Sequence, residues 1–476
     1  MLFLLVSIYI FFTITIGIFA ARKVKTSNDF AVAGRSLSLP VVIATVFATW
    51  FGAEAIFGVS STFIDEGLTG VVADPFGASL CLVIAGVIFS KYLYKFNFST
   101  LSTFYRKRYN RSIEVIITLI IILSYLGWVA AQITAIGLVL KVITNGLIGE
   151  SLGMILGTIA VLSYTTLGGM VSVAIIDLVQ MIVIIIGLII TVYFVVELSG
   201  GIIPVINLAS MNGKLNFFPN GNIWLWLSFV GSLITMMLGS ITQQDVYQRI
   251  TSARTQKIAL WGSLIGALLY FCFAFLPMFI AYSATIINPE FSANIDAHGS
   301  EIILPLFIMQ YTPIFAQVIF FGAVISAIMS TSAATLLAPS VMFTENILSE
   351  YLPGLTDKKK LLIMRQSLIV FAIAVLIYAF NSELTIFGMV ESAYKVTLVG
   401  AFTPLIFGIF WKKANDYGAL LAIILGVFSW LSLELLFGDH FIVPPQLIGF
   451  AFSVFGMLVG SLVFKQDLSK KLIIHT

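Results

Sequence analysis

Apolar stretches of about twenty residues recur along this sequence, and they constrain its fold more than any other feature. A helix rises 1.5 Å per residue, so about twenty apolar residues cross the roughly 30 Å hydrocarbon core of a bilayer. Among the 476 residues, 59% are hydrophobic and 10% are charged, which is far from the composition of soluble domains. We therefore predict an all-α integral membrane protein.

These stretches predict about thirteen transmembrane helices in a single polytopic domain over residues 1–476. The first lacks a basic leader and a small-residue cleavage site, so it is interpreted as a retained helix. In chain order the predicted spans are 2–20, 39–63, 71–89, 113–143, 152–167, 170–196, 223–243, 259–286, 314–348, 361–380, 384–411, 418–437 and 446–464.

Positive charge falls into alternate loops and predicts the orientation. If the amino terminus is outside, the inner loops hold 22 of the 25 basic residues, and only Lys141, Lys214 and Lys395 remain. Because basic residues favour the cytoplasmic side, we expect a multi-pass protein of the plasma (inner) membrane with its carboxyl terminus in the cytoplasm. This distribution concerns insertion and does not indicate nucleic-acid binding.

The usual residues of enzyme centres are scarce. The two cysteines, Cys81 and Cys272, lie inside apolar runs, which excludes a disulfide framework. The histidines, His298, His440 and His475, have no second ligand type at metal spacing, so a zinc or haem site is not expected. Without a Gly-rich phosphate loop either, we predict no enzyme activity, no organic cofactor and no ATP.

Glu54 is a carboxylate in the middle of an apolar run. An ionisable side chain at that depth costs roughly 2.5–3.5 kcal/mol and normally faces a protein interior. Gly52 and the alanines beside it suit a helix that breaks at mid-membrane and turns free carbonyls toward an ion. The alternative is an unbroken helix in which Glu54 pairs with a neighbouring helix.

Two other polar groups lie deep in predicted spans. Asp177 follows Gly168 and Gly169, and its alternative role is a helix-terminal contact that holds this turn. Gln243 closes a span that contains Gly239, which is a second place where a helix can unwind.

Small residues and hydroxyls fill the stretch 326–335. Close helix packing with back-bonded hydroxyls is one interpretation. The other is a sodium site, because a hard cation takes oxygen ligands. Such a site would use the hydroxyls of Ser330 and Thr331, a carbonyl of Ala327 freed by a kink, and the carbonyls of Ala48 and Phe51.

Three motifs in order resemble the sodium:solute symporter family: 28–37 its first cytoplasmic loop, 168–180 its central signature, and 322–331 its ion-binding helix. The resemblance implies a LeuT-like fold of two inverted five-helix repeats. It divides the chain into an extra N-terminal helix and loop (1–37), a first repeat (38–198), a second repeat (220–411), and two C-terminal helices with a short tail (412–476). Both lead helices should be broken at the midplane.

The resemblance also implies a secondary active transporter that couples Na⁺ to a small organic solute by alternating access. The partners would be Na⁺, the solute and the bilayer, with no obligatory protein partner. A sodium-independent or proton-coupled carrier is the main alternative. A channel or a transporter-like sensor fits the sequence less well than either carrier. The resemblance also assigns the family's sodium site to the same five residues, and it associates Asp177 with ion release. The five are Ala48, Phe51, Ala327, Ser330 and Thr331.

Several stretches are most similar to choline-transporting members of the family. Trp50 and Trp128 would form two walls of an aromatic cage, with Glu54 as counter-charge. Gln243 stands where a third aromatic would be expected and suits a solute with hydrogen-bonding groups, so a proline-like amino acid and a choline-like amine both stay open. The alternative role for each of these tryptophans is packing against lipid or in the protein core. The predicted pocket comprises Trp50, Gly52, Glu54, Trp128, Gln132, Gly239 and Gln243.

Overall fold

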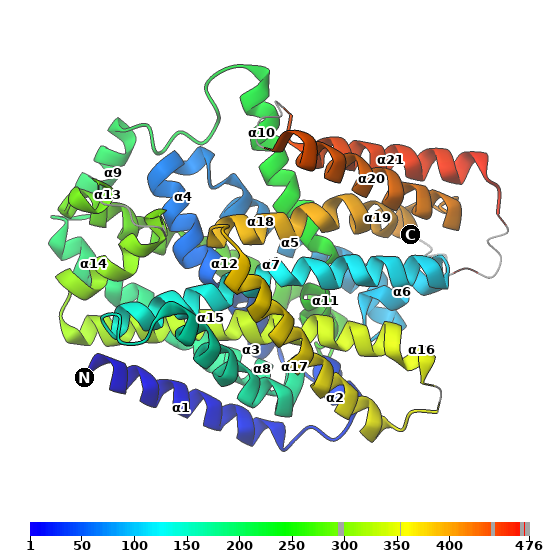
Figure 1. The fold of residues 1–476 in the computed structure, drawn as a ribbon, viewed down its shortest axis with the longest axis horizontal. Coiled ribbons are helices and arrows are strands. Elements are labelled where there is room, and N and C mark those ends of the chain that lie inside the picture. Colours follow the sequence, from blue (N-terminus) through cyan, green and yellow to red (C-terminus); the bar gives the residue numbers. More distant parts are fainter. Residues whose placement is uncertain (294–298, 353, 439–442, 467–470, 472–476) are drawn as a thin grey trace.

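The computed structural model describes residues 1–293, 299–352, 354–438, 443–466 and 471, and its regular elements there are all helices. Helix α1 (Leu2–Ala21) lies along one edge and packs on α8 (Glu150–Leu198) and α15 (Ile314–Phe343) (Figure 1). Helices α20 (Asp416–Phe437) and α21 (Pro445–Val463) pair at the opposite edge. The predicted all-α class is confirmed.

The number of spans depends on how bent helices are counted. Among the described residues, eleven helices are long and apolar enough to cross a membrane, and one bent pair makes twelve. Helix α8 has 49 residues and leaves helical geometry at Gly169. At 1.5 Å per residue it is about twice as long as one crossing requires. If α8 is divided at Gly169 into two spans, the number of candidate spans among the described residues rises from twelve to thirteen.

The span that contains Glu54 is broken, as predicted. Helix α3 (Leu39–Trp50) ends at Phe51, and the chain resumes as η2 (Glu54–Gly58) and α4 (Val59–Glu66) after a bend of 58°. A Cβ added at Gly52 would lie 2.6 Å from Thr331 Oγ1, so the backbone needs glycine at this close approach.

A second broken span follows α10 (Ile223–Ile234). The chain passes through a π-helical turn (Thr235–Gly239) and a 3₁₀ turn (Ser240–Thr242), is extended at Gln243 (φ −71°, ψ 135°), and continues as α11 (Gln244–Thr251). The predicted span 223–243 matches the apolar span Ile223–Thr242, but the polar helix α11 beyond it was not predicted. Helix α11 is polar, so its sequence gives no hydropathy signal, yet every residue of it is buried.

Two further expectations about helix shape need correction. Helix α15 runs without interruption from Ile314 to Phe343, so the kink expected near Ala327 is absent. Hydroxyls of this helix bond to carbonyls one turn earlier, for example Ser332 to Ile328, and such bonds leave the helix intact. An unpredicted irregularity occurs at Asp74 (φ −136°, ψ 121°), just before α5 (Ala78–Ile88).

The remaining helices complete the fold around these breaks. They are α2 (Ser27–Val32), α6 (Leu101–Arg108), α7 (Arg111–Ile143), α9 (Ile202–Met211), α12 (Gln256–Ile287), α13 (Glu290–Ala293), α14 (Ile303–Tyr311), α16 (Ser349–Tyr351), α17 (Asp357–Asn381), α18 (Ile386–Thr397) and α19 (Thr403–Phe410).

Candidate functional site

Glu54 lies at the break between α3 and α4 and is held by two donors of α7. Trp128 Nε1 donates to its Oε1 at 3.0 Å, and Gln132 Nε2 donates to its Oε2 at 2.5 Å. The amide oxygen of Gln132 also accepts from the Ala53 backbone N–H at 2.8 Å. Trp128 and Gln132 are four residues apart, so one face of α7 presents both groups to the break. The structure thus brings together three residues of the predicted pocket.

Aromatic rings surround this carboxylate. The Trp50 ring centroid lies 5.6 Å from that of Trp128, 6.2 Å from that of Tyr394 and 6.4 Å from that of Tyr270. Tyr125 stacks on Trp128 at 6.0 Å, and all five rings are buried. The faces of such rings attract cations. Four helices, α3, α7, α12 and α18, supply this cluster.

Two predicted pocket residues have other neighbours. The Gly239 backbone packs against the carbonyl of Tyr394, so this glycine permits close approach of α18. Gln243 Nε2 donates to Ser124 Oγ of α7 at 3.0 Å. The second break is thereby attached to α7 at Ser124, the residue before Tyr125.

The candidate sodium ligands lie where α3, α8 and α15 meet. Thr331 Oγ1 donates to the Ala48 carbonyl at 3.3 Å, which joins the broken helix to α15. Ser330 Oγ donates to Asp177 Oδ1 at 2.6 Å, and Asp177 Oδ2 has no partner. Ala327 and Phe51, the other two candidates, are fully buried among the same helices.

A buried arginine lies between the two broken spans. Arg249 Nε donates to Thr49 Oγ1 at 2.9 Å, and its Nη1 donates to the Asp245 carbonyl at 3.3 Å. Tyr125 donates its hydroxyl to Asp245 Oδ1 at 2.5 Å. Arg249 also interacts electrostatically with Asp177. The guanidinium thus binds the backbone of Asp245 and interacts only electrostatically with the carboxylates of Asp245 and Asp177.

Asp74 was not among the predicted site residues. Its Oδ1 accepts from the Tyr270 hydroxyl at 2.5 Å, its Oδ2 has no partner, and the side chain is fully buried. The signal was available, because Asp74 is an acid inside the predicted span 71–89, as Glu54 is inside its own. Tyr270 and Tyr394 gave no comparable signal, since aromatic residues are common in apolar spans.

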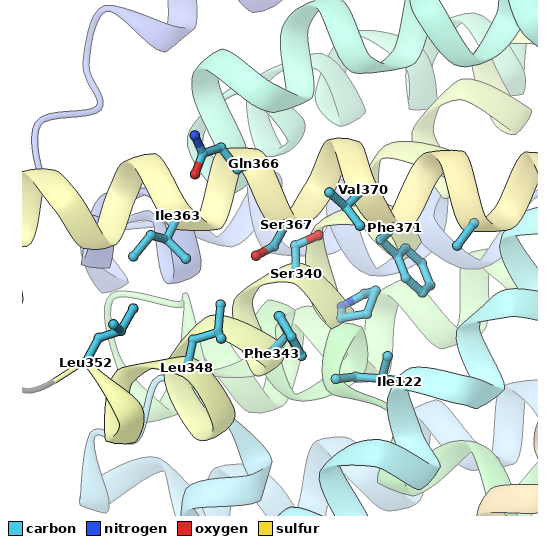
Figure 2. A pocket seen from close by; sticks show the side chains of 12 residues that line it. Ile122, Ser340, Phe343, Leu348, Leu352, Ile363, Gln366, Ser367, Val370 and Phe371 are labelled. Carbon is cyan, nitrogen blue, oxygen red and sulfur yellow. The ribbon is translucent and has the colours of Figure 1, made fainter.

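The void beside Glu54 is small. A void of about 10 Å³ touches Glu54, Ala73 and Tyr394, which leaves no room for a solute. A separate hollow of about 440 Å³ opens between α17 and the end of α15, away from these residues (Figure 2). Ile363, Val370 and Phe371 face it from α17, and none of the predicted site residues lines it.

Predictions about metal ligands concern residues that the structure only partly describes. His298, His440 and His475 lie outside the described residues. In the described part of the chain, no three His, Cys, Asp or Glu side chains are grouped to hold a metal ion. Cys81 and Cys272 are free thiols.

Comparison with known proteins places this geometry among transporters. Residues 30–426 match the sodium:solute symporter family. The human high affinity choline transporter 1 is 27% identical over 450 residues, with 89% of this chain and 75% of the transporter covered. The sodium/proline symporter of Escherichia coli (strain K12) is 27% identical over 486 residues, with 96% and 92% covered.

A solved structure shows the same fold. The chain matches a substrate-bound, outward-open state of a Na⁺-coupled sialic acid symporter with a TM-score of 0.82, 19% identity and 98% of both chains covered. At this identity the likeness concerns the fold alone, and it confirms the predicted LeuT-like architecture.

Proposed function

Because the chain belongs to the sodium:solute symporter family and is a Na⁺-coupled symporter, we propose that its solute is a small organic cation. One observation carries this proposal: Glu54 is fixed at the helix break by Trp128 and Gln132, and no described lysine or arginine pairs with it. A buried carboxylate without a cation is costly. An organic cation beside Glu54 and the rings of Trp50 and Trp128 would supply the missing charge and the cation–π contacts.

For the sodium ion we propose the five oxygen ligands of Ala48, Phe51, Ala327, Ser330 and Thr331. Support comes from the hydrogen bond between Thr331 and the Ala48 carbonyl, which places a hydroxyl and a free helix-end carbonyl side by side. Hydroxyl and carbonyl oxygens suit a hard cation. Without a kink in α15, the Ala327 carbonyl would serve the ion and its own helix together.

Asp177 is proposed to receive the ion on its way to the cytoplasm. Its Oδ1 holds the Ser330 hydroxyl, and its Oδ2 is free to accept a cation. An ion that leaves Ser330 therefore meets a carboxylate in the next step.

Sodium bound between α3 and α15 would favour the state that exposes a completed solute pocket, and both species would then cross together. A potential of 100 mV supplies about 2.3 kcal/mol per charge, and a tenfold sodium gradient supplies about 1.4 kcal/mol more. We propose repeats at 38–198 and 220–411, flanked by 1–37 and 412–476. The proposed location is the plasma membrane, with the amino terminus outside and no organic cofactor.

The test is uptake into proteoliposomes for choline, betaine, proline, sialic acid, pantothenate and simple sugars, with an inward Na⁺ gradient against a K⁺ control. We expect Na⁺-dependent uptake of a cation, and we expect Glu54→Gln to reduce it at least about tenfold, since an ion pair is lost. Glu345→Gln, which removes a pair with Lys360 away from the centre, is the control and should leave uptake unchanged.

If Glu54→Gln impairs cationic and neutral solutes equally, Glu54 is not a counter-ion. A Na⁺-dependent signal for proline alone would favour an amino acid, which the Escherichia coli relative transports by its name.

A further inference from the structure

The acids around the broken spans outnumber the cations that can balance them. Glu54, Asp74, Asp177 and Asp245 are all at most 2% exposed. The described cation that interacts with this group is Arg249, through Asp245 and Asp177. A buried carboxylate is stabilised either by protonation or by a nearby cation, and a bound cation would keep Glu54 and Asp74 ionised.

Two of the four acids already have a counter-charge. Asp245 lies beside Arg249, and Asp177 shares that guanidinium and holds Ser330 of the proposed sodium site. Arg249 and one Na⁺ therefore balance Asp245 and Asp177. Glu54 and Asp74 are left without a positive partner among the described residues.

Asp74 is prepared to accept a further hydrogen bond. Tyr270 occupies only its Oδ1, and its Oδ2 is buried without a partner. Asp74 follows Ala73, which lines the small central void together with Glu54, and the two carboxylates interact electrostatically. Asp74 is thus the direct neighbour in sequence of a residue that borders the void beside Glu54.

An apolar surface separates the two acids. Trp128, the donor to Glu54, lies on one side of Trp50 with ring centroids 5.6 Å apart. Tyr270, the donor to Asp74, meets the Trp50 ring edge to face at 6.4 Å. Trp50 therefore contacts both aromatic residues whose polar groups bind the two carboxylates.

We infer that the solute is a small organic dication, in which an apolar spacer packs on Trp50 and joins one ammonium group at Glu54 to a second at Asp74. This inference rests on the proposed function and sharpens it from one positive charge to two. Each ammonium would donate N–H groups to a carboxylate, which a quaternary ammonium cannot do.

The experiment uses the full chain in proteoliposomes. Linear alkane diamines of increasing length are compared with monoamines of equal length, both as competitors and as solutes, under an inward Na⁺ gradient. We expect one diamine to act at about tenfold lower concentration than its matched monoamine, because it gains a second ion pair. Charge movement recorded with uptake should equal that of one sodium ion plus two positive charges per solute.

Asp74→Asn should abolish the preference for the diamine and leave the monoamine nearly unchanged. Asp65→Asn, which alters an exposed carboxylate near Ser300, is the matched control. Na⁺-dependent thermal stabilisation of each variant reports folding independently of the solute. A folded Asp74→Asn protein that keeps the diamine preference overturns the inference, as does wild-type protein that treats both amines alike.

The result also separates the inference from its premise. Monoamine transport without diamine preference overturns the dication but keeps a cationic solute. Sodium binding without uptake of any amine overturns the proposed solute class and the dication with it.

Discussion

Three neighbouring hydroxyls on α15 show how little a side chain's type says about its role. Ser332 bonds to the Ile328 carbonyl of its own helix at 2.7 Å. Ser330 bonds to Asp177 of α8, and Thr331 bonds to the Ala48 carbonyl of α3. All three are buried, but only the last two reach other helices, Ser330 to Asp177 and Thr331 to the candidate ligand Ala48.

This difference gives a prediction at the scale of single residues. We expect Ser330→Ala and Thr331→Ala each to raise the Na⁺ concentration for half-maximal uptake by roughly tenfold, because one charged hydrogen bond or ligand is worth about 1.5 kcal/mol or more. Ser332→Ala should have little effect. Uptake measured against Na⁺ concentration decides the matter, and unchanged sodium dependence in both variants would refute the site.

The bend in α8 shows how one element places the sodium region. Gly169 has φ +47° and ψ −139°, a conformation that L side chains rarely adopt. A Cβ there would lie 2.5 Å from the Phe30 carbonyl oxygen of α2. The bend directs the second half of α8, with Asp177, against α15.

We therefore expect Gly169→Ala to destabilise the protein by about 1–3 kcal/mol from backbone strain, with a further steric cost. Gly322→Ala is the matched control, since no atom lies within 4 Å of its added Cβ and alanine favours a helix. Thermal unfolding in detergent should show a lower Tm for the first variant only. Equal Tm values would mean that the bend tolerates a side chain.

At the scale of the whole molecule, a carboxylate outside the membrane spans joins two distant segments. Glu301, in a short helical turn at 299–302, accepts a hydrogen bond from the backbone N–H of Ile386 at the start of α18 at 2.8 Å. Burial raises the pKa of Glu301 to about 7, more than its backbone hydrogen bonds lower it, and Glu150 adds a smaller repulsion. The segment before α15 is thus attached to α18, which carries Tyr394.

This pKa predicts a pH dependence. Because the folded value lies above the unfolded value of about 4.3, the contribution of Glu301 to stability is complete below that pH and is lost as pH rises through about 7. Relative to wild type, the free energy of unfolding of Glu301→Gln should therefore rise between pH 5 and 7.5, by up to about 1.4 kcal/mol per pH unit, and the Tm difference should shift in the same direction. Other buried acids titrate in both proteins, so their contributions to the difference in stability cancel. A constant difference would contradict the prediction.

Much of the architecture could be predicted before the structure. Glu54 at depth, with Gly52 beside it, indicated the first helix break, and Gly239 near Gln243 indicated the second. Helix α11 escaped prediction because its buried polar face is satisfied by tertiary contacts, such as Gln244 with Leu101. Asp74 carried the same signal as Glu54, and only its partner and its free oxygen show its importance.

Several properties follow from the residues alone. They are the membrane location, the approximate spans, the family resemblance and the presence of carboxylates deep in the spans. Length and hydropathy act locally along the chain, so these properties can be read residue by residue. Which acids have a partner depends on the tertiary structure, since Trp128 and Tyr270 come from helices distant in sequence from Glu54 and Asp74. Whether a buried acid has a neighbouring cation depends on which residues meet in the folded interior. The proposed nature of the solute therefore rests on the fold.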